Sequence, residues 1–159
     1  MNKSLTIDYQ EFALNELSAA DRALVDEAAR AALTAHNPYS NFYVGAALRL
    51  ADGTVVRGSN QENIAYPSGL CAERTAMFAA SAQHPGVAFD ALAIVGGVRK
   101  GDSETLELRP ASPCGACRQV MSEYEAAGGR KMRILLYFSD HKILVFEGVE
   151  NLLPFVFAM

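Results

Sequence analysis

The chain has 159 residues, of which 50% are hydrophobic, so it is long enough to form one domain with a substantial core. Its net charge is −4 and its basic residues are scattered, which disfavours a polynucleotide partner and favours a small neutral ligand. No apolar stretch is long enough to span a membrane, and "MNKSLTIDYQ" lacks the apolar region of a secretory signal. Because the three cysteines are an odd number, we expect a cytoplasmic protein without a disulfide scaffold.

The first part of the chain predicts an N-terminal arm, a helix and a β-hairpin. Residues 1–17 have loose apolar spacing and are expected to form an arm across the core of a single domain that covers residues 1–159. Ser18 and Asp21 form a capping pair for a helix, whose apolar spacing continues to "HNPYS". The runs "FYVGAALRL" and "GTVVRGS" are separated by Ala51-Asp52-Gly53, which predicts a hairpin.

The second part predicts two further helices and three further strands. After the loop "NQENIAYPSG", a helix is expected from about Cys71 to before Pro85, followed by a buried central strand at "FDALAIVGGV". A long loop over residues 99–113 leads to a third helix, "CGACRQVMSEYEAAGG", which ends at two glycines. The short connection between "RILLYF" and "ILVFEG" requires antiparallel strands, and "VENLLPFVFAM" predicts a short helix with an aromatic tail. The expected fold is a three-layer α/β/α sandwich on a mixed five-stranded sheet.

Cys114 and Cys117 are three residues apart at the expected start of the third helix. Residues at i and i+3 lie on one helix face, and the positive helix N-terminus favours thiolate over thiol. The pair can therefore ligate a metal ion. A thioredoxin-like redox pair uses the same C-x-x-C spacing, but it is expected early in the chain, after the first strand.

Cys71 also lies at an expected helix start, two residues before Glu73. Residues two apart in a helix point in nearly opposite directions, so both can serve one site only if Cys71 is the cap residue. Three sulfur atoms would then hold a zinc ion and leave the fourth tetrahedral position for water, as in catalytic sites. The alternative is a closed structural zinc site with a histidine ligand, although none of the three histidines has ligand spacing to a cysteine: His36, His84 and His141.

The combination Cys71-Ala72-Glu73 and Pro113-Cys114-Gly115-Ala116-Cys117 matches the all-cysteine form of the zinc deaminase pattern. The blocks "NPYSNFYVGAAL", "GSNQENIAYPSGLCAERTA", "SPCGACRQVM" and "LLPFVF" also match in order. Over roughly residues 20–157, the sequence therefore resembles the homotetrameric cytidine deaminases. The resemblance implies their fold, one zinc ion per subunit, and pockets that are shared between subunits.

The resemblance also implies a role for each matching residue of the metal centre. Cys71, Cys114 and Cys117 match the zinc ligands, and Glu73 matches the proton shuttle. Arg74 matches a residue that hydrogen-bonds the zinc thiolates, which would offset their negative charge.

Seven more residues match substrate-binding positions of the family. Asn60 and Glu62 match the pair that binds the ribose hydroxyl, although both could be ordinary polar residues of a loop. The remaining matches are a ring that lines the base pocket (Phe42), a backbone near the base (Ala72), two positions supplied by a neighbouring subunit (Ile64 and Tyr66), and a tail aromatic that stacks on an adjacent subunit's substrate (Phe157). Phe42 and Tyr66 could instead fill the core, and Phe155 is a rival for the tail position.

The activity implied by the resemblance is the hydrolytic deamination of cytidine and 2′-deoxycytidine, with release of ammonia, in pyrimidine salvage. Three alternatives remain: a deaminase of a modified cytosine nucleoside such as blasticidin S, a deaminase of polynucleotide or nucleotide bases, and a catalytically silent zinc-binding protein. The ribose pair Asn60 and Glu62 favours an ordinary nucleoside, and the short connector before the last strand disfavours a polynucleotide deaminase. The expected partners are thus a nucleoside and further copies of the chain, without nucleic acid or membrane.

Overall fold

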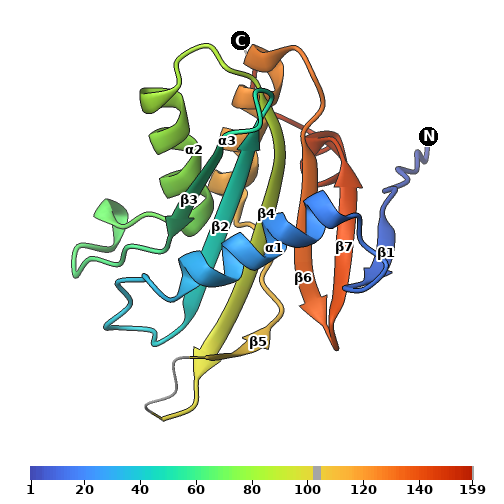
Figure 1. Ribbon diagram of the computed structural model, residues 1–159. Coiled ribbons are helices and arrows are strands. Elements are labelled where there is room, and N and C mark those ends of the chain that lie inside the picture. Colours follow the sequence, from blue (N-terminus) through green and yellow to red (C-terminus); the bar gives the residue numbers. More distant parts are fainter. Residues whose placement is uncertain (102–104, 159) are drawn as a thin grey trace.

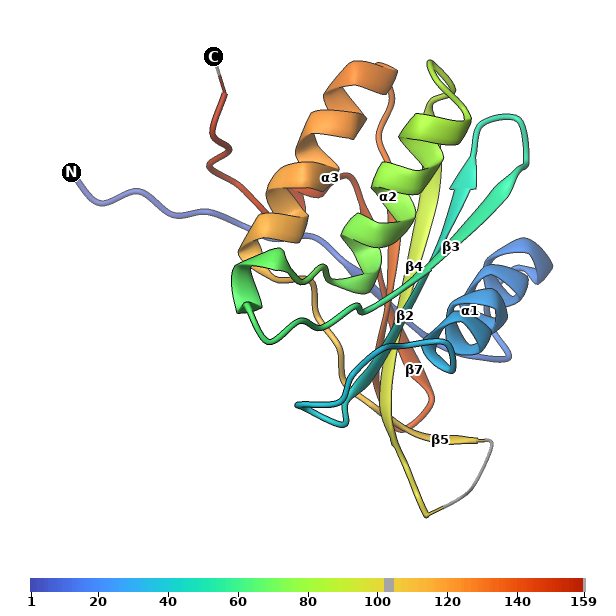
Figure 2. The ribbon, with the colours of Figure 1, turned by 90° about the vertical axis from the view of Figure 1, so that its left-hand side faces the viewer.

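A computed structural model describes residues 1–101 and 105–158, which form a sheet with helices on both faces (Figure 1). Helix α1 covers one face, and α2 and α3 cover the other, as seen along the sheet edge in Figure 2. This arrangement confirms the predicted three-layer α/β/α sandwich. The helices are α1 (Ala19–Ala32), α2 (Ala72–Gln83) and α3 (Gly115–Gly128), with two 3₁₀ turns, η1 (Tyr66–Ser68) and η2 (Val149–Asn151).

In the described part of the chain, the sheet has seven strands in the order β1-β7-β6-β4-β2-β3, with β5 paired to β4 outside this path. Only β4 and β6 are parallel in that part, and the other pairs, including the last two strands, are antiparallel as predicted. The strands are β1 (Gln10–Ala13), β2 (Tyr43–Leu50), β3 (Val55–Ser59), β4 (Phe89–Arg99), β5 (Leu106–Arg109), β6 (Arg133–Ser139) and β7 (Lys142–Glu147).

The predicted count of five strands was wrong because two short strands add to the edges of others. Strand β1, inside the expected arm 1–17, pairs with the free edge of β7. Strand β5, inside the expected loop 99–113, pairs with the end of β4 that extends beyond β6. Each has four residues and lacks a long alternating pattern, so its pairing depends on an edge that the rest of the sheet provides. Residues 102–104 of the predicted loop lie outside the described residues.

Local signals in the sequence account for the ends of the main elements. The Ser18 hydroxyl accepts a hydrogen bond from the Asp21 backbone N–H, which confirms the predicted helix cap. Gly53 has a φ of 89° in the β2–β3 hairpin, and Gly129 ends α3 with a φ of 63°. Both glycines occupy the left-handed region that other residues avoid. Among the described residues, no helix is sufficiently long and apolar to cross a bilayer.

Two apolar clusters fill the space on either side of the sheet. One lies between the sheet and helices α2 and α3, and the other lies between the sheet and α1. On the first side, Gly58 of β3 is in close contact with α2: a Cβ atom there would lie 2.5 Å from the Ala72 carbonyl oxygen. The absence of a side chain at Gly58 therefore allows the start of α2, which carries much of the candidate site, to lie directly on the sheet.

Candidate active site

The three cysteines meet where α2 and α3 begin. Cys71 is the N-cap of α2 and Cys114 is the N-cap of α3, both with extended backbone (φ −70° and −69°). Cys117 lies one turn into α3 and is buried. Because Cys71 is outside the helical turn, it and Glu73 can serve the same site, as the sequence required.

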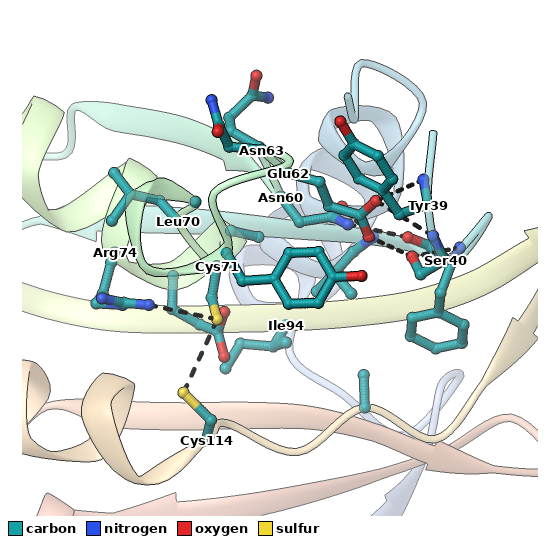
Figure 3. A pocket seen from close by; sticks show the side chains of 18 of the residues that line it. Tyr39, Ser40, Asn60, Glu62, Asn63, Leu70, Cys71, Arg74, Ile94 and Cys114 are labelled. Carbon is teal, nitrogen blue, oxygen red and sulfur yellow. Dashed lines mark hydrogen bonds between the residues drawn. The ribbon is translucent and has the colours of Figure 1, made fainter. Parts of the chain in front are cut away.

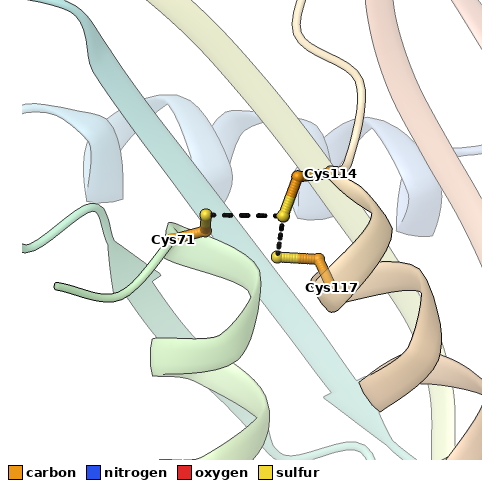
Figure 4. Close-up of side chains that lie close together, drawn as sticks. All are labelled: Cys71, Cys114 and Cys117. Atoms are coloured by element: carbon orange, nitrogen blue, oxygen red, sulfur yellow. Dashed lines mark hydrogen bonds between the residues drawn. The ribbon is translucent and has the colours of Figure 1, made fainter. Parts of the chain in front are cut away.

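The separations of the sulfur atoms fit a metal ion. The Cys71 and Cys114 Sγ atoms are 3.8 Å apart, and the Cys114 and Cys117 Sγ atoms are 3.5 Å apart (Figure 4). All three sulfur atoms lie within 4.8 Å of one another, and all three cysteines are free. Zinc–sulfur bonds of about 2.3 Å in a tetrahedron place the sulfur atoms about 3.8 Å apart. The described residues thus provide a zinc-sized cage of three thiols, and the two N-cap positions place it in the positive potential of two helices.

Arg74 adds a positive charge to this cage. Its Nη2 atom lies 3.8 Å from Cys71 Sγ, in hydrogen-bonding range for sulfur. A hydrogen bond from the Cys117 thiol, together with Arg74, holds the pKa of Cys71 well below its ordinary value, whereas the hydrogen bond to Cys71 and burial raise the pKa of Cys117. The site therefore favours the thiolate form of Cys71, which is the form that binds metal, whereas Cys117 keeps its proton in the metal-free site.

Glu73 is buried beside the thiols, with 3% of its surface exposed. Burial raises the pKa of its carboxyl to about 7, with a smaller contribution from the nearby Cys71. A carboxyl with this pKa can gain or lose a proton near neutral pH, which is the property required of a general acid–base group.

A cavity of about 730 Å³ extends from these residues to the protein surface (Figure 3). Cys71, Glu73 and Cys114 line its inner end, and Ile94 of β4 lies beside them. The outer end is formed by two segments, 39–44, which runs into the start of β2, and 60–66, which runs into η1. The volume suits a small molecule of nucleoside size.

Asn60 lies in the cavity wall and fixes the backbone of segment 39–44. Its Oδ1 accepts a hydrogen bond from the Val44 N–H at 2.8 Å, and its Nδ2 donates to the Phe42 carbonyl oxygen at 2.9 Å. The amide thus bonds on both sides of Tyr43 and holds the main chain at Phe42.

Glu62 is bonded to the beginning of the same segment. Its carboxylate accepts hydrogen bonds from the Tyr39 N–H at 2.9 Å, the Ser40 N–H at 3.2 Å and the Ser40 hydroxyl. The Ser40 hydroxyl is the main cause that lowers the pKa of Glu62. The two residues predicted to bind ribose therefore line the cavity, and hydrogen bonds to backbone groups hold their side chains in one orientation.

Phe42 lines the cavity. Its ring lies against Gly96 of β4, where a Cβ atom would come within 3.0 Å of Phe42 Cζ. Gly96 therefore leaves the space in which the ring lies.

The remaining predicted residues differ in position. Ala72 is fully buried and lines the inner end of the cavity. Tyr66 lines the outer end, is 74% exposed and contacts Tyr39 edge-on with 6.2 Å between ring centres. Ile64 and Phe157 are 80% and 76% exposed and do not line the described cavity of their own chain.

Several residues around the cavity were not given a role from the sequence. Ser40 lies inside the block "NPYSNFYVGAAL", but its hydrogen bond to Glu62 joins residues 22 apart. Gly96 and Gly97 interrupt an otherwise apolar strand, which is a signal of close approach by another group. The contact of Gly96 with Phe42 gives that signal a physical cause.

Comparison with known proteins finds a protein family whose model matches the part of the chain that forms this site. Residues 18–128, which include all three cysteines and Glu73, match the family model described as the cytidine and deoxycytidylate deaminase zinc-binding region. The chain is 46% identical over 100 residues to a cytidine deaminase of Halalkalibacterium halodurans (63% of this chain, 68% of the relative). It is 49% identical over 102 residues to a cytidine deaminase of Sporosarcina psychrophila (64% and 67%).

Solved structures give the same result. The crystal structure of cytidine deaminase from Burkholderia pseudomallei is 42% identical in sequence and superimposes with a TM-score of 0.70. The match covers 85% of this chain and 97% of that chain. The similarity therefore includes the arrangement of the sheet and helices around the site.

Proposed function

Since the chain belongs to the cytidine and deoxycytidylate deaminase family, we propose that it hydrolyses cytidine and 2′-deoxycytidine to uridine, 2′-deoxyuridine and ammonia. The observation that carries this proposal is the meeting of three thiols and a buried carboxyl at the inner end of one cavity. This is the donor set of a hydrolytic zinc site with an adjacent proton carrier.

The metal ion of this family is zinc, and the cage of Cys71, Cys114 and Cys117 fits it. When bound, zinc lowers the pKa of a coordinated water to about 7 and so supplies hydroxide at neutral pH. Three thiolates carry more negative charge than the ion carries positive charge. Arg74 and the starts of α2 and α3 offset this excess.

Glu73 is the proposed proton shuttle. It would accept one proton from the water whose oxygen bonds to C4 and donate that proton to N3 of the pyrimidine ring. It would then accept the second proton from the oxygen on C4 and pass it to the amino group, so that the C4–N bond breaks, ammonia leaves and C4 keeps a carbonyl. Its burial supports this role, because burial raises the pKa of the carboxyl to about 7 and so makes both the acidic and the basic form accessible.

The cavity as a whole is the proposed nucleoside site, with the base toward its inner end and the ribose at its outer end. Phe42 and the Ala72 backbone would contact the base, and Asn60 and Glu62 would bind the ribose hydroxyl. Glu62 supports this role because its low pKa keeps the carboxylate charged and able to accept a hydrogen bond from a hydroxyl group.

We also propose a homotetramer in which neighbouring copies complete each cavity. Large exposed side chains support the proposal, since Ile64, Tyr66 and Phe157 are each more than 70% exposed in the single chain. In the tetramer, Ile64, Tyr66 and Phe157 would extend to the cavity of an adjacent copy. Gel filtration that detects an active monomer would contradict the arrangement.

Three broader proposals accompany the activity. Residues 1–159 would form a single domain, since both apolar clusters pack on one sheet. The location would be the cytoplasm, where three free thiols stay reduced and available to a metal. The process would be pyrimidine salvage, in which free nucleosides are returned to use.

Replacement of Glu73 by glutamine tests the proposal. The amide keeps the size of the side chain but cannot carry the proton, so we expect retained zinc and a fall in cytidine turnover of at least about 100-fold. Turnover is followed by the ultraviolet change from cytidine to uridine, and zinc by metal analysis. Glu123→Gln, at an exposed carboxylate on α3, is the control and should keep normal activity. Equal activity of Glu73→Gln and wild type would remove the proposed shuttle.

The same assay separates the alternative substrates. Turnover of blasticidin S with cytidine unchanged would identify a deaminase of modified nucleosides, and no turnover of either would indicate a silent zinc-binding protein. We expect cytidine to be the substrate, in agreement with the relatives of this chain.

A further inference from the structure

The C-terminal segment 154–158 carries two exposed aromatic rings. Phe155 is 84% exposed and Phe157 is 76% exposed, and the segment has no helix or strand. Exposed rings of this size commonly contact another molecule. A segment without regular structure, however, has to be held in place by other contacts if it is to present a ring in a defined position.

Gln119 of α3 provides such contacts. Its Nε2 donates a hydrogen bond to the Phe157 carbonyl oxygen at 2.9 Å, and its Oε1 accepts one from the Phe157 N–H at 3.2 Å. Between described residues, these are the only hydrogen bonds shown for segment 154–158. One side-chain amide therefore fixes the backbone of Phe157 at both of its polar groups, while the ring stays free.

The residue before Gln119 holds the beginning of the same C-terminal region. Arg118 donates from Nε to the Pro113 carbonyl oxygen at 2.9 Å and from Nη1 to the Leu152 carbonyl oxygen at 2.8 Å. Arg118 and Gln119 directly follow Cys117 in α3. The start of one helix thus holds two of the three metal ligands, and the next two residues fix the path of the tail relative to them.

We infer that Gln119 is a positioning residue, which holds the backbone of Phe157 so that its ring is presented to the cavity of a neighbouring copy. The inference rests on the proposed role of Phe157 and adds the residue that makes this role possible. Restricting the segment before binding lowers the entropy lost when the ring binds next to substrate. It also distinguishes the two rings, because no hydrogen bond between described residues fixes the backbone of Phe155.

The test is the kinetic effect of Gln119→Ala on the intact assembly. Loss of both hydrogen bonds should raise KM for cytidine about tenfold, as expected for two weakened contacts, with kcat within about twofold of wild type. Zinc content and assembly size should not change. Glu123→Ala is the matched control and should leave KM unchanged, because Glu123 is an exposed residue one turn further along α3 and no hydrogen bond between described residues joins its side chain to segment 154–158.

A graded variant separates positioning from a general structural role. Gln119→Glu keeps the chain length and the acceptor for the Phe157 N–H but loses the donor to the Phe157 carbonyl oxygen, so its KM should lie between wild type and Gln119→Ala. In a Phe157→Ala background, Gln119→Ala should raise KM no further, because both changes remove one interaction. Additive effects would overturn the inference, as would loss of zinc in Gln119→Ala.

A direct readout of the tail is available because the chain contains no tryptophan. In Phe157→Trp, the single indole reports on residue 157 alone, and adding Gln119→Ala should lower its fluorescence anisotropy. An unchanged anisotropy would overturn the positioning role. If Phe157→Ala raises KM and Gln119→Ala does not, only the role of Gln119 fails. If Phe157→Ala has no effect, the proposed role of Phe157 itself fails.

Discussion

The two ends of the cavity are built in different ways and contain glutamates with opposite properties. At the inner end, Glu73 lies on a helix that packs on the sheet, and burial raises the pKa of its carboxyl to about 7. At the outer end, Glu62 lies on a loop, and the Ser40 hydroxyl lowers the pKa of its carboxyl. A glutamate side chain is thus suited to proton transfer at the inner end and to hydrogen bonding as a charged carboxylate at the outer end. The difference comes from the surrounding structure, not from the residue type.

The comparison predicts that changes at the inner end affect metal and chemistry, whereas changes at the outer end affect substrate binding. At the inner end, the starts of α2 and α3 fix the cysteines and Glu73, which lie within a few residues of each helix start. The outer end depends on hydrogen bonds between residues that are 16 to 23 positions apart in sequence. Three substitutions test this division, in order of expected effect.

The largest effect is expected from Cys117→Ala. Cys117 is fully buried, and its loss removes one of three sulfur ligands from the cage. We expect zinc content to fall to a small fraction of one per chain and turnover to fall by more than about 100-fold, because metal ligands are more sensitive than the groups around them. Metal analysis and the cytidine assay measure both. Full zinc occupancy in this variant would contradict the claim that the inner end of the cavity binds the metal.

A smaller effect is expected from Gly58→Ala, which acts on the inner end through the contact between β3 and α2. The new methyl group would meet the backbone of α2 at Ala72 and Ala76, so the helix that carries Glu73 has to move. We expect a loss of about 1–3 kcal/mol in the free energy of unfolding, measured by urea denaturation, together with weaker zinc binding.

Gly115→Ala is the control for this substitution. Gly115 begins α3, and apart from its chain neighbours and the backbone of its own helix no atom lies within 4 Å of the position of an added Cβ. The same change there should stabilise the helix by up to about 1 kcal/mol. Destabilisation of equal size by both substitutions would show that close packing at Gly58 is not the cause.

The smallest effect is expected from Ser40→Ala at the outer end. The variant loses the hydroxyl bond to Glu62 but keeps the backbone bonds from Tyr39 and Ser40. KM for cytidine should rise about threefold to tenfold, with kcat and zinc content unchanged, as for a single lost hydrogen bond. The pKa of Glu62 should rise toward its ordinary value, so the carboxyl would gain its proton at higher pH than in wild type.

A carboxyl-carbon NMR titration measures this shift, with the Glu62 signal assigned by its absence in Glu62→Gln. An unchanged pKa would show that Ser40 does not set the charge of Glu62 in the proposed ribose site. A loss of zinc in Ser40→Ala would contradict the division between the two ends.

The inner end could be predicted from the sequence because its geometry is local. The i, i+3 spacing of Cys114 and Cys117 and the requirement that Cys71 cap a helix both follow from helix geometry, and the structure brings the three sulfur atoms together. The main helices and the central strands were predicted for the same reason, since caps, turns and apolar patterns lie within a few residues of one another.

The features that were missed depend on contacts between distant residues. Strands β1 and β5 form only because β7 and β4 leave edges free, and the sequence of a short strand does not encode a partner edge. Ser40 and Gln119 are ordinary polar residues until the fold places them beside Glu62 and Phe157. Long-range pairing, not residue type, gives these positions their roles.

The central claim is that three sulfur atoms of this chain hold one metal ion beside Glu73. Zinc-edge X-ray absorption of the purified protein tests this most directly, because it counts the sulfur and lighter ligands of the ion. We predict three sulfur ligands at about 2.3 Å and one oxygen ligand. Four sulfur ligands, or a histidine nitrogen in place of the oxygen, would contradict the account.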